Sequence, residues 1–456
     1  MGVMKRKEQS FWLVHLLIFF NLLLALVAFI KDIVVASYFG TSGIADAINL
    51  AFFLPDTLGN NLIGAAIAVS SIPVLTKLSL NENQSLYQDT IQKLGAIVIT
   101  GTLLLLVICS LFFQSLMHLF PLDTHESSTT VFTYFLIMTP IICCAPLWLL
   151  GSSVLQASRK FIIPAITPIV FNLVLLIALL WCLWKGIPQT YGGRAFSFAS
   201  TFGTMLCVIV TWAFVLRQQK WRWSLQSLSL KSDFTEVQKV LYTFFAYALI
   251  LFFSQLGLLA ERLFASSLQT GTIAALTYAY RLSQFPLWVF IAAINTFILP
   301  TISLHLEKND LASLKRDLVK SLLLVIGSSG FISLIFVLFS EPIVSLLFLR
   351  GSFTADSVQL TSDILKGYGL SILGQSLYVF CTRFYVAQSK MKVPLCIGLI
   401  GCSVNIGLLF IFVPWLGAGG IGYAVAISST ISGGLLLSHF IRDLVQIVRK
   451  GGTSAE

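Results

Sequence analysis

Charged residues are scarce in this 456-residue chain. Asp, Glu, Lys and Arg together make up 11% of it and hydrophobic residues 57%, whereas about 25% of the residues in an ordinary soluble domain are charged. This composition excludes a soluble globular protein. The hydrophobic residues form many separate runs longer than about 18 residues, the length of a membrane-spanning helix, and a β-barrel would show short alternating segments instead. We therefore predict an all-α polytopic membrane protein.

Recognisable catalytic and metal-binding motifs are missing as well. The five histidines are scattered without an HExxH motif, and the eight cysteines lie in apolar runs without flanking histidines. There is no GxxxxGK[ST] phosphate-binding loop, which excludes ATP hydrolysis by that route, and there is no hydrophilic catalytic domain. We expect a transporter rather than an enzyme, with no catalytic residues, no metal and no cofactor. Na⁺, H⁺ and the membrane potential remain open as driving forces.

Twelve apolar runs are long enough to span a bilayer. They cover residues 11–33, 46–76, 94–120, 130–156, 161–183, 195–216, 238–263, 271–304, 319–348, 357–388, 393–415 and 419–441. An even number of spans places both termini on one side of the membrane, which we take as the cytoplasm.

The distribution of basic residues supports this orientation. The loops and tails on the predicted cytoplasmic side carry 21 Lys and Arg residues. The opposite loops carry only 3, which are Lys185, Arg194 and Arg350. Such asymmetry is typical of the positive-inside rule. It also accounts for the net charge of +10 without a nucleic acid as partner.

The two halves of the chain resemble each other. The longest polar connector predicts an N-terminal six-helix lobe at 1–216, a cytoplasmic linker at 217–239 and a C-terminal six-helix lobe at 240–456. The segment ASRKFIIP after the fourth span matches AQSKMKVP after the tenth, and Asn172 and Asn405 follow in the next helix of each half. Equivalent halves of this kind predict two lobes related by an axis along the membrane normal, with a central cavity and a binding site near the midplane.

A small set of charged residues lies within or beside the spans. Because a charge at membrane depth costs roughly 3 kcal/mol, it normally faces a protein interior or a water-filled cavity. The candidates are Lys31, Asp32, Asp46 and Asp56 in or beside the first two spans, and Glu261 and Arg281 in the seventh and eighth. We interpret Glu261 and Asp56 as ion-binding or pairing residues, and Glu261 could simply pair with Arg281.

The candidates of the first half also have plainer structural explanations. Lys31 and Asp32 directly follow twenty uncharged residues, so they could form a pair at the membrane interface, with the lysine extended toward the head groups. Asp46 could cap the N-terminus of the second span, where carboxylates are favoured. Asp56 follows Pro55 and could mark the restart of a broken helix.

Several motifs together resemble the MurJ/MviN lipid II flippase family, within the multidrug, oligosaccharidyl-lipid and polysaccharide exporter superfamily. They are AFIKDIVVASYFG…ADAINLAFFLPD near the N-terminus, YAYRLSQFPLWVF (278–290), LFLRGSFTADSV (347–358) and RFYVAQSKMKVP (383–394). The resemblance runs from about residue 10 to about residue 445. It implies a flippase in the bacterial plasma membrane that moves an undecaprenyl-diphosphate-linked cell-wall precursor, lipid II or a related lipid-linked glycan, from the inner to the outer leaflet by alternating access.

The resemblance also assigns roles to single residues. Lys31 takes the place of an arginine of the family, Asp32, Asp46 and Arg281 match charged residues of its motifs, and Glu261 stands where the family has an aspartate. We therefore predict that Lys31, Asp32, Asp46 and Arg281 bind the substrate. Other charged positions of the family hold uncharged residues in this chain, which are Ala25, Gly59, Asn60, Gly64, Tyr280 and Gln284. The family commonly adds two helices after the twelfth span, and we expect this chain to be without them.

The physical logic of a flippase stands beside the resemblance. A diphosphate carries about two negative charges and cannot cross hydrocarbon bare, whereas Lys and Arg in a hydrated cavity can hold it. Two alternatives remain open: a cation-coupled multidrug exporter of the same architecture, and a non-transporting scaffold for cell-wall synthesis, which the missing arginines allow. We expect a monomer whose partners are the lipid-linked saccharide, membrane lipids and cell-wall synthesis proteins.

Overall fold

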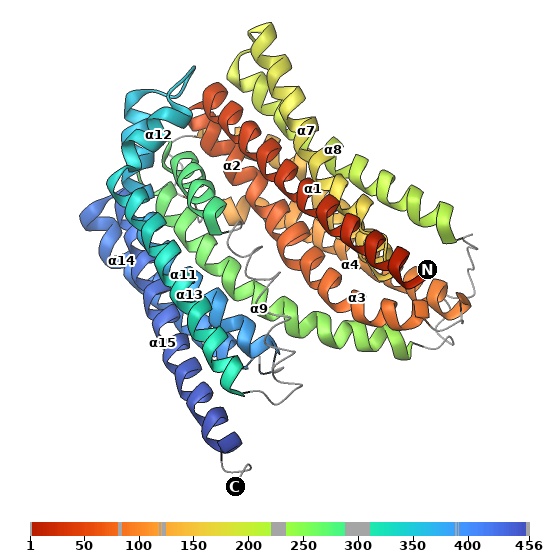
Figure 1. The fold of residues 1–456 in the computed structure, drawn as a ribbon. Coiled ribbons are helices and arrows are strands. Elements are labelled where there is room, and N and C mark those ends of the chain that lie inside the picture. Colours follow the sequence, from red (N-terminus) through yellow and green to blue (C-terminus); the bar gives the residue numbers. More distant parts are fainter. Residues whose placement is uncertain are drawn as a thin grey trace. The chain divides into compact units, whose positions relative to one another are not determined.

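The computed structural model describes residues 2–80, 84–117, 120, 125–219, 234–287, 311–387, 390 and 392–452. Nearly all of these residues are helical and none of them lies in a β-strand, which confirms the predicted all-α class. The chain divides into two compact units, Met1–Phe252 and Phe253–Glu456. Figure 1 shows the helices of each unit in the order of the chain.

The described residues of the first unit contain six helical segments that are long and apolar enough to cross a membrane. Its helices are α1 (Gly2–Phe39), α2 (Gly43–Pro55), the π-helix η1 (Asp56–Gly64), α3 (Ala65–Leu80), α4 (Gln84–Met117), α5 (His125–Met138), α6 (Ile141–Ala157), α7 (Ile162–Lys185) and α8 (Gln189–Gln219). Helices α2, η1 and α3 follow one another as a single segment, and so do α5 and α6. These six segments match the six spans predicted for the first half.

Helix α9 (Thr235–Ser266) contains the boundary between the two units. The second unit continues with a helix at 272–287. It then contains α11 (Leu311–Leu338), α12 (Ser340–Phe348), α13 (Ala355–Ala387), α14 (Lys392–Leu416) and α15 (Ala418–Gly452). The predicted linker and lobe boundaries stay predictions, because residues 220–233 lie outside the described part of the chain.

Ten candidate spans are found among the described residues, against the twelve predicted. The predicted span 271–304 lies outside the described residues from 288 onward. The predicted span 357–388 corresponds to α13, a continuous helix of 33 residues that is not among the ten because it is less apolar. The total of twelve therefore stays a prediction.

Helices α13 and α15 cross at a distance that only glycine permits. A Cβ atom at Gly367 would lie 2.2 Å from the carbonyl carbon of Gly422, and one at Gly374 would lie 2.6 Å from the backbone of Ser429. Small residues of this kind allow the close backbone approach by which membrane helices associate. The crossing fixes α13, which carries residues of the candidate site, against α15.

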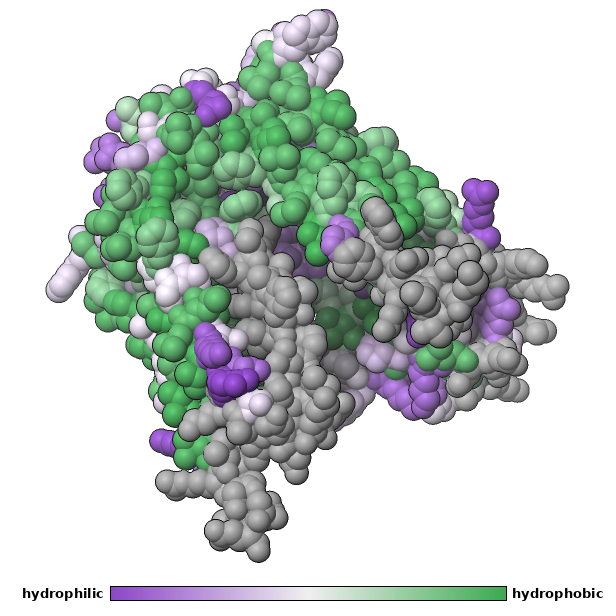
Figure 2. Space-filling view, viewed as in Figure 1, coloured by the Kyte–Doolittle hydropathy of each residue, from purple (hydrophilic) through white to green (hydrophobic). Residues whose placement is uncertain are grey.

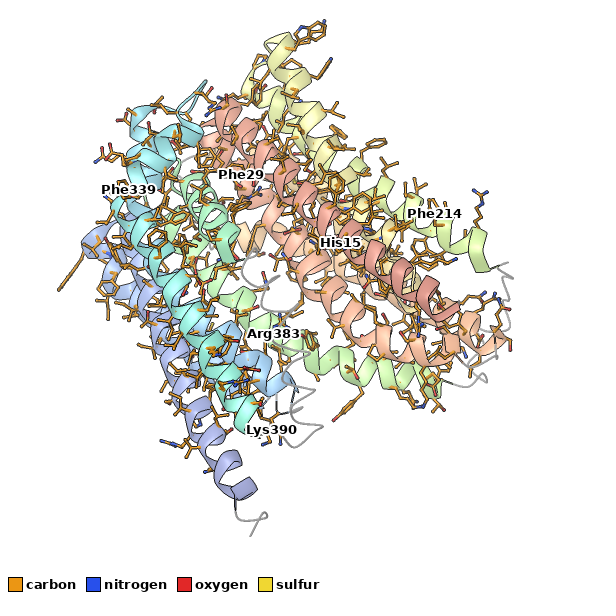
Figure 3. The ribbon with its side chains drawn as sticks, viewed as in Figure 1. His15, Phe29, Phe214, Phe339, Arg383 and Lys390 are labelled. Atoms are coloured by element: carbon orange, nitrogen blue, oxygen red, sulfur yellow. The ribbon has the colours of Figure 1, made fainter. Side chains whose placement is uncertain are left out.

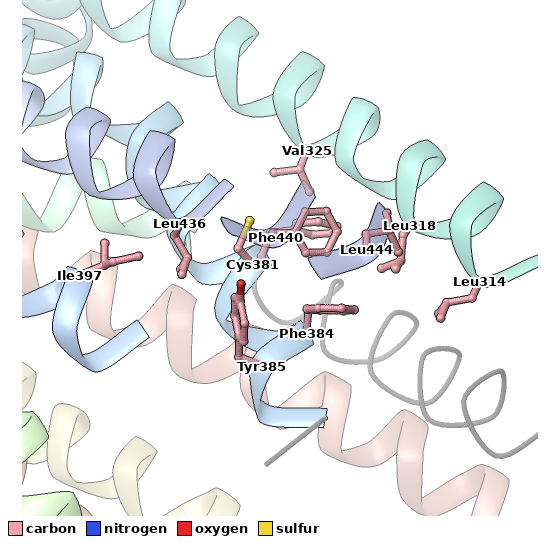
Figure 4. Packing of buried hydrophobic residues seen from close by; sticks show 11 residues of the cluster. Leu314, Leu318, Val325, Cys381, Phe384, Tyr385, Ile397, Leu436, Phe440 and Leu444 are labelled. Carbon is pink, nitrogen blue, oxygen red and sulfur yellow. The ribbon is translucent and has the colours of Figure 1, made fainter. Parts of the chain in front are cut away.

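Toward the end of α13 a buried cluster joins α11, α13, α14 and α15. Figure 4 shows this cluster, which includes Leu314 and Leu318 of α11, Phe384 of α13 and Phe440 of α15. The rings of Phe384 and Phe440 meet edge to face, with centroids 4.8 Å apart, the geometry that aromatic pairs prefer. Arg383 lies beside this cluster one turn before the end of α13, and Lys390 lies beyond that end (Figure 3).

Large apolar side chains are exposed along the spanning helices. Phe214 of α8 and Phe339 after α11, both labelled in Figure 3, are two of many. Hydrophobic residues accordingly cover much of the surface visible in Figure 2. A soluble protein rarely exposes such large apolar patches, so these faces are those expected to contact lipid.

Candidate functional site

Lys31 and Asp32 lie inside α1 and not after its end. The helix continues to Phe39, so the pair stands about two turns before the terminus, just beyond Phe29 (Figure 3). Lys31 is only 7% exposed, and its Nζ lies 3.1 Å from Oδ1 of Asp32. A lysine that extends toward the head groups would keep its ammonium in water. The observed burial therefore favours a role inside the protein.

The second span begins with a capped helix start. Ser42 is the N-cap residue of α2, and its hydroxyl accepts a hydrogen bond from the backbone N–H of Ala45 at 3.2 Å. Asp46 lies half-buried in the first turn, where a carboxylate complements the helix dipole. The N-cap is therefore Ser42, and the role of Asp46 in substrate binding stays a prediction.

A π-helix interrupts this span directly after Pro55. The Asp56 carboxylate at its start accepts hydrogen bonds from the side-chain amides of Asn61 at 2.9 Å and Asn60 at 3.3 Å. π-Helices are rare, and most are single-turn bulges within α-helices, which occur frequently at functional sites. The backbone thus continues after Pro55 as a wider helix, where the sequence had indicated a break and a restart.

Glycine residues form the side of η1 that contacts α6. A Cβ atom at Gly59 would lie 2.8 Å from the carbonyl oxygen of Ile141, and one at Gly64 would lie 2.5 Å from Cδ1 of Leu149. The family resemblance places an arginine at the first of these positions and a glutamate at the second. At Gly59 the backbone of α6 leaves no room for an arginine side chain, whereas at Gly64 the close atom on α6 is the end of the Leu149 side chain.

Glu261 of α9 is buried between two other helices of the second unit. The hydroxyl of Tyr368 on α13 donates a hydrogen bond of 2.5 Å to Oε2, and Nδ2 of Asn405 on α14 donates one of 3.1 Å to Oε1. Glu261 itself is 4% exposed. Among the described residues these two side chains donate hydrogen bonds to the carboxylate, and the neighbouring Arg262 interacts with it through its charge. The sequence had identified Asn405 only as a marker of the repeat and had missed Tyr368.

Arg281 lies half-buried in the helix at 272–287. One turn further along, Nε2 of Gln284 donates a hydrogen bond of 3.1 Å to Oε1 of Gln375 on α13. Gln375 in turn donates one of 2.9 Å to the hydroxyl of Ser371. Gln284 stands where the resemblance places a glutamate. A neutral amide network therefore holds the helix of Arg281 against α13.

The predicted site residues fall into two groups by unit. Lys31, Asp32, Asp46 and Asp56 belong to the first unit, and Glu261 and Arg281 belong to the second. The residues described by the structure contain no group of three or more His, Cys, Asp or Glu side chains that could hold a metal ion. Apolar spanning helices with a few buried charges define a multi-pass membrane protein.

Comparison with known proteins identifies the family to which this membrane protein belongs. The sequence profile of the family described as "Lipid II flippase MurJ" matches residues 35–453. The chain therefore belongs to the MurJ lipid II flippase family and lies in the bacterial membrane. This confirms the resemblance found in the sequence, and it confirms the prediction of a transporter for cell-wall biogenesis rather than an enzyme.

Two curated relatives illustrate the match. The chain is 27% identical over 402 residues to a probable lipid II flippase MurJ of Thermotoga maritima, covering 88% of this chain and 79% of the relative. It is 26% identical over 439 residues to a probable lipid II flippase MurJ of Rhizobium meliloti, with coverages of 93% and 80%.

Solved structures agree with this assignment. A lipid II flippase MurJ in an inward closed conformation is similar with a TM-score of 0.76 and 25% identity, over 95% of this chain and 90% of that one. An inward-facing multidrug resistance transporter of the MATE family is similar with a TM-score of 0.80 and 11% identity, over 93% and 96%. The second likeness concerns the fold alone.

Proposed function

We propose that this chain translocates an undecaprenyl-diphosphate-linked cell-wall precursor, lipid II or a related lipid-linked glycan, from the inner to the outer leaflet. Membership of the MurJ family over residues 35–453 supports the proposal. The observation that carries it is Lys31, a cation only 7% exposed within a membrane-spanning helix, about two turns before its end. A buried intramembrane charge of this kind is functional by default.

In the proposed mechanism two homologous lobes alternate access to a central cavity. Lys31 and Arg281 are the proposed cations for the diphosphate. Asp32 orients the Lys31 ammonium through their ion pair, and Asp46 contributes to the polar lining. The lipid tail stays in the bilayer, so only the head group needs a hydrated path. Both termini lie in the cytoplasm, and the protein acts as a monomer.

Neutral amides support recognition of a saccharide. Asn60 and Gln284 stand at positions where the family resemblance places charged residues, and their amides contact Asp56 and Gln375. An amide side chain both donates and accepts hydrogen bonds, which suits sugar hydroxyl groups better than phosphate. With fewer cations to hold the diphosphate, the affinity of this chain for its substrate depends more strongly on the glycan.

Growth complementation tests the proposal. Expression of the wild-type chain in bacteria depleted of their own lipid II flippase should restore growth and cell shape, because flipping of the precursor is then the missing step. The fold shared with multidrug transporters supports a second candidate, a cation-coupled drug exporter. Gradient-dependent export of ethidium without rescue of growth would establish that candidate in place of the flippase.

We propose that a cation bound at Glu261 drives the flipping of the substrate. Asn405 is 7% exposed, and its amide oxygen has no hydrogen-bond partner within the described residues, while its amide nitrogen contacts the Glu261 carboxylate. A buried carboxylate beside an available amide oxygen fits H⁺ or Na⁺, which needs hard oxygen ligands. The membrane potential, acting on the site charges, is the remaining candidate.

Glu261→Gln should therefore weaken the dependence of flipping on the driving ion. A hydrogen bond or contact to a charged group contributes about 1.5–3 kcal/mol, so we expect the apparent affinity for Na⁺ to fall about 10- to 100-fold. Coupling to H⁺ should be lost, because the glutamine amide does not take up a proton. The measurement is flipping in proteoliposomes with an imposed pH or Na⁺ gradient. Tyr368→Phe is the matched control, since it removes one donor but keeps the charge and should have a smaller effect. Unchanged dependence on both gradients in Glu261→Gln would contradict the assignment.

A further inference from the structure

The hairpin of α7 and α8 carries two of the three cations on the side opposite the basic loops. Lys185 is the last residue of α7, and Arg194 lies in the second turn of α8. Each cation lies over an aromatic ring: Nζ of Lys185 is 4.2 Å from the Trp184 centroid, and Cζ of Arg194 is 5.8 Å from that of Tyr191. Trp184 is 76% exposed and Tyr191 61%, so both pairs face outward from the protein.

The hairpin provides no negative charge to balance these cations. The sequence contains neither Asp nor Glu between Glu126 and Asp233. The ion pairs formed within the described residues include neither Lys185 nor Arg194. The negative charge that balances Lys185 and Arg194 must therefore come from outside this hairpin.

An exposed apolar stripe continues from each cation along its helix. On α7 the stripe follows Trp184 with Trp181 and Ile177, and on α8 it follows Arg194 with Phe198 and Phe202. Residues three and four apart lie on one face of a helix. Aromatic and basic residues at the end of an apolar stripe mark the membrane–water interface. The two cations therefore lie at the level of lipid head groups.

The turn between the two helices is held by hydrogen bonds to α1 and α5. The hydroxyl of Tyr38 donates to the carbonyl of Ile187 at 2.5 Å, and Nε2 of Gln189 donates back to the carbonyl of Tyr38 at 2.8 Å. From α5, the hydroxyl of Tyr134 donates to the carbonyl of Thr190 at 3.0 Å. These hydrogen bonds hold the turn that carries Lys185 and Arg194 in place, so a ligand would bind to an ordered turn.

We propose that Lys185 and Arg194, with the rings of Trp184 and Tyr191, form a binding site for the phosphate of an anionic phospholipid in the outer leaflet. The phosphate supplies the negative charge that the hairpin lacks, and the acyl chains lie along the two apolar stripes. Because Tyr38 ties the turn to α1, the bound lipid also holds the end of the helix that carries the buried Lys31 pair. This site is separate from the proposed substrate site and does not depend on the proposed function.

Fluorescence quenching in vesicles tests the site. The protein is reconstituted in phosphatidylcholine, and phosphatidylglycerol or phosphatidylcholine with a spin-labelled head group is titrated in. The Trp184 signal is the difference between the wild type and Trp184→Phe. Each cation near an anionic lipid surface contributes about a fivefold preference, so labelled phosphatidylglycerol should quench Trp184 at about 25-fold lower mole fraction than the labelled phosphatidylcholine.

The charge variants separate the outcomes. Lys185→Ala with Arg194→Ala should abolish the preference for phosphatidylglycerol, while Lys185→Arg with Arg194→Lys should retain it. Arg217→Ala, at the other end of α8, is the matched control and should behave as the wild type. Equal quenching by both lipids in the wild type, or a preference that survives the double alanine variant, would overturn the proposal. Loss of the preference in millimolar inorganic phosphate would assign the site to free phosphate and would also overturn it.

Discussion

Lys31→Ala should abolish growth rescue in flippase-depleted cells while the amount of protein in the membrane stays unchanged. Lys31 is buried in α1, where its ammonium can meet a diphosphate with little competition from water. Because a hydrogen bond to a charged group contributes about 1.5–3 kcal/mol, binding of the lipid-linked substrate should weaken about 10- to 100-fold. Growth of the depleted strain and native mass spectrometry with the purified lipid measure the two effects.

A second pair of variants separates substrate binding from charge balance. If Lys31 only neutralised Asp32, with which it forms an ion pair, then Lys31→Met combined with Asp32→Asn would remove both charges and restore activity. We expect the double variant to remain inactive and Lys31→Arg to remain active, since the arginine keeps the positive charge. Full growth of Lys31→Ala together with Arg281→Ala would instead indicate a scaffold that does not transport.

Hydropathy predicted the spans of the first unit well, but it did not predict where helices end. The first apolar run stops near residue 33, yet α1 continues to Phe39. Apolar composition reports contact with lipid, whereas the last turns of α1 contact protein. Tyr38, which is 5% exposed, there bonds to the α7–α8 turn 149 residues away. Lys31 is therefore embedded in the protein instead of lying at its margin.

The partners of the buried carboxylate show a second limit of sequence reasoning. Glu261 was a candidate from its depth in the seventh span and from the family resemblance, but its donors lie 107 and 144 residues further along the chain. The repeat pairs Asn405 with Asn172, and the structure gives them different contacts. The amide of Asn172 donates to the carbonyl of Pro168 in its own helix, while that of Asn405 reaches Glu261. The two asparagines lie about one turn out of register in the repeat, and the repeat did not predict the contacts of either one.

The π-helix was beyond prediction for a related reason. Pro55 signals an irregularity in the second span, but a wider helix is only one way to accommodate it. In η1, Gly59 packs closely against the backbone of α6, a contact that no local sequence pattern reveals. The same contact determines at which positions of η1 this chain has room for a charged side chain of the family.

The family resemblance places arginines at residues 59 and 60. Introducing an arginine at each of these two positions should therefore affect the stability of the protein differently. Gly59→Arg should lower the free energy of unfolding by about 3 kcal/mol or more, because overpacking and an unsatisfied buried polar group each cost in that range. Even its Cβ atom would lie 2.8 Å from the carbonyl oxygen of Ile141. Thermal unfolding of the detergent-solubilised protein measures this loss, and Gly59→Ala should show part of it.

Asn60→Arg is the matched variant one residue further along. Asn60 is half-buried, and its amide donates a long hydrogen bond of 3.3 Å to Asp56, so a guanidinium there can replace that contact and retain room to extend. We expect Asn60→Arg to unfold at the wild-type temperature and, under the proposed function, to bind the lipid diphosphate more tightly, by about tenfold for one added charge-assisted hydrogen bond. Equal stability of Gly59→Arg and Asn60→Arg would contradict the close packing of η1 on α6. Stable protein without tighter binding in Asn60→Arg would instead place this face of η1 away from the substrate.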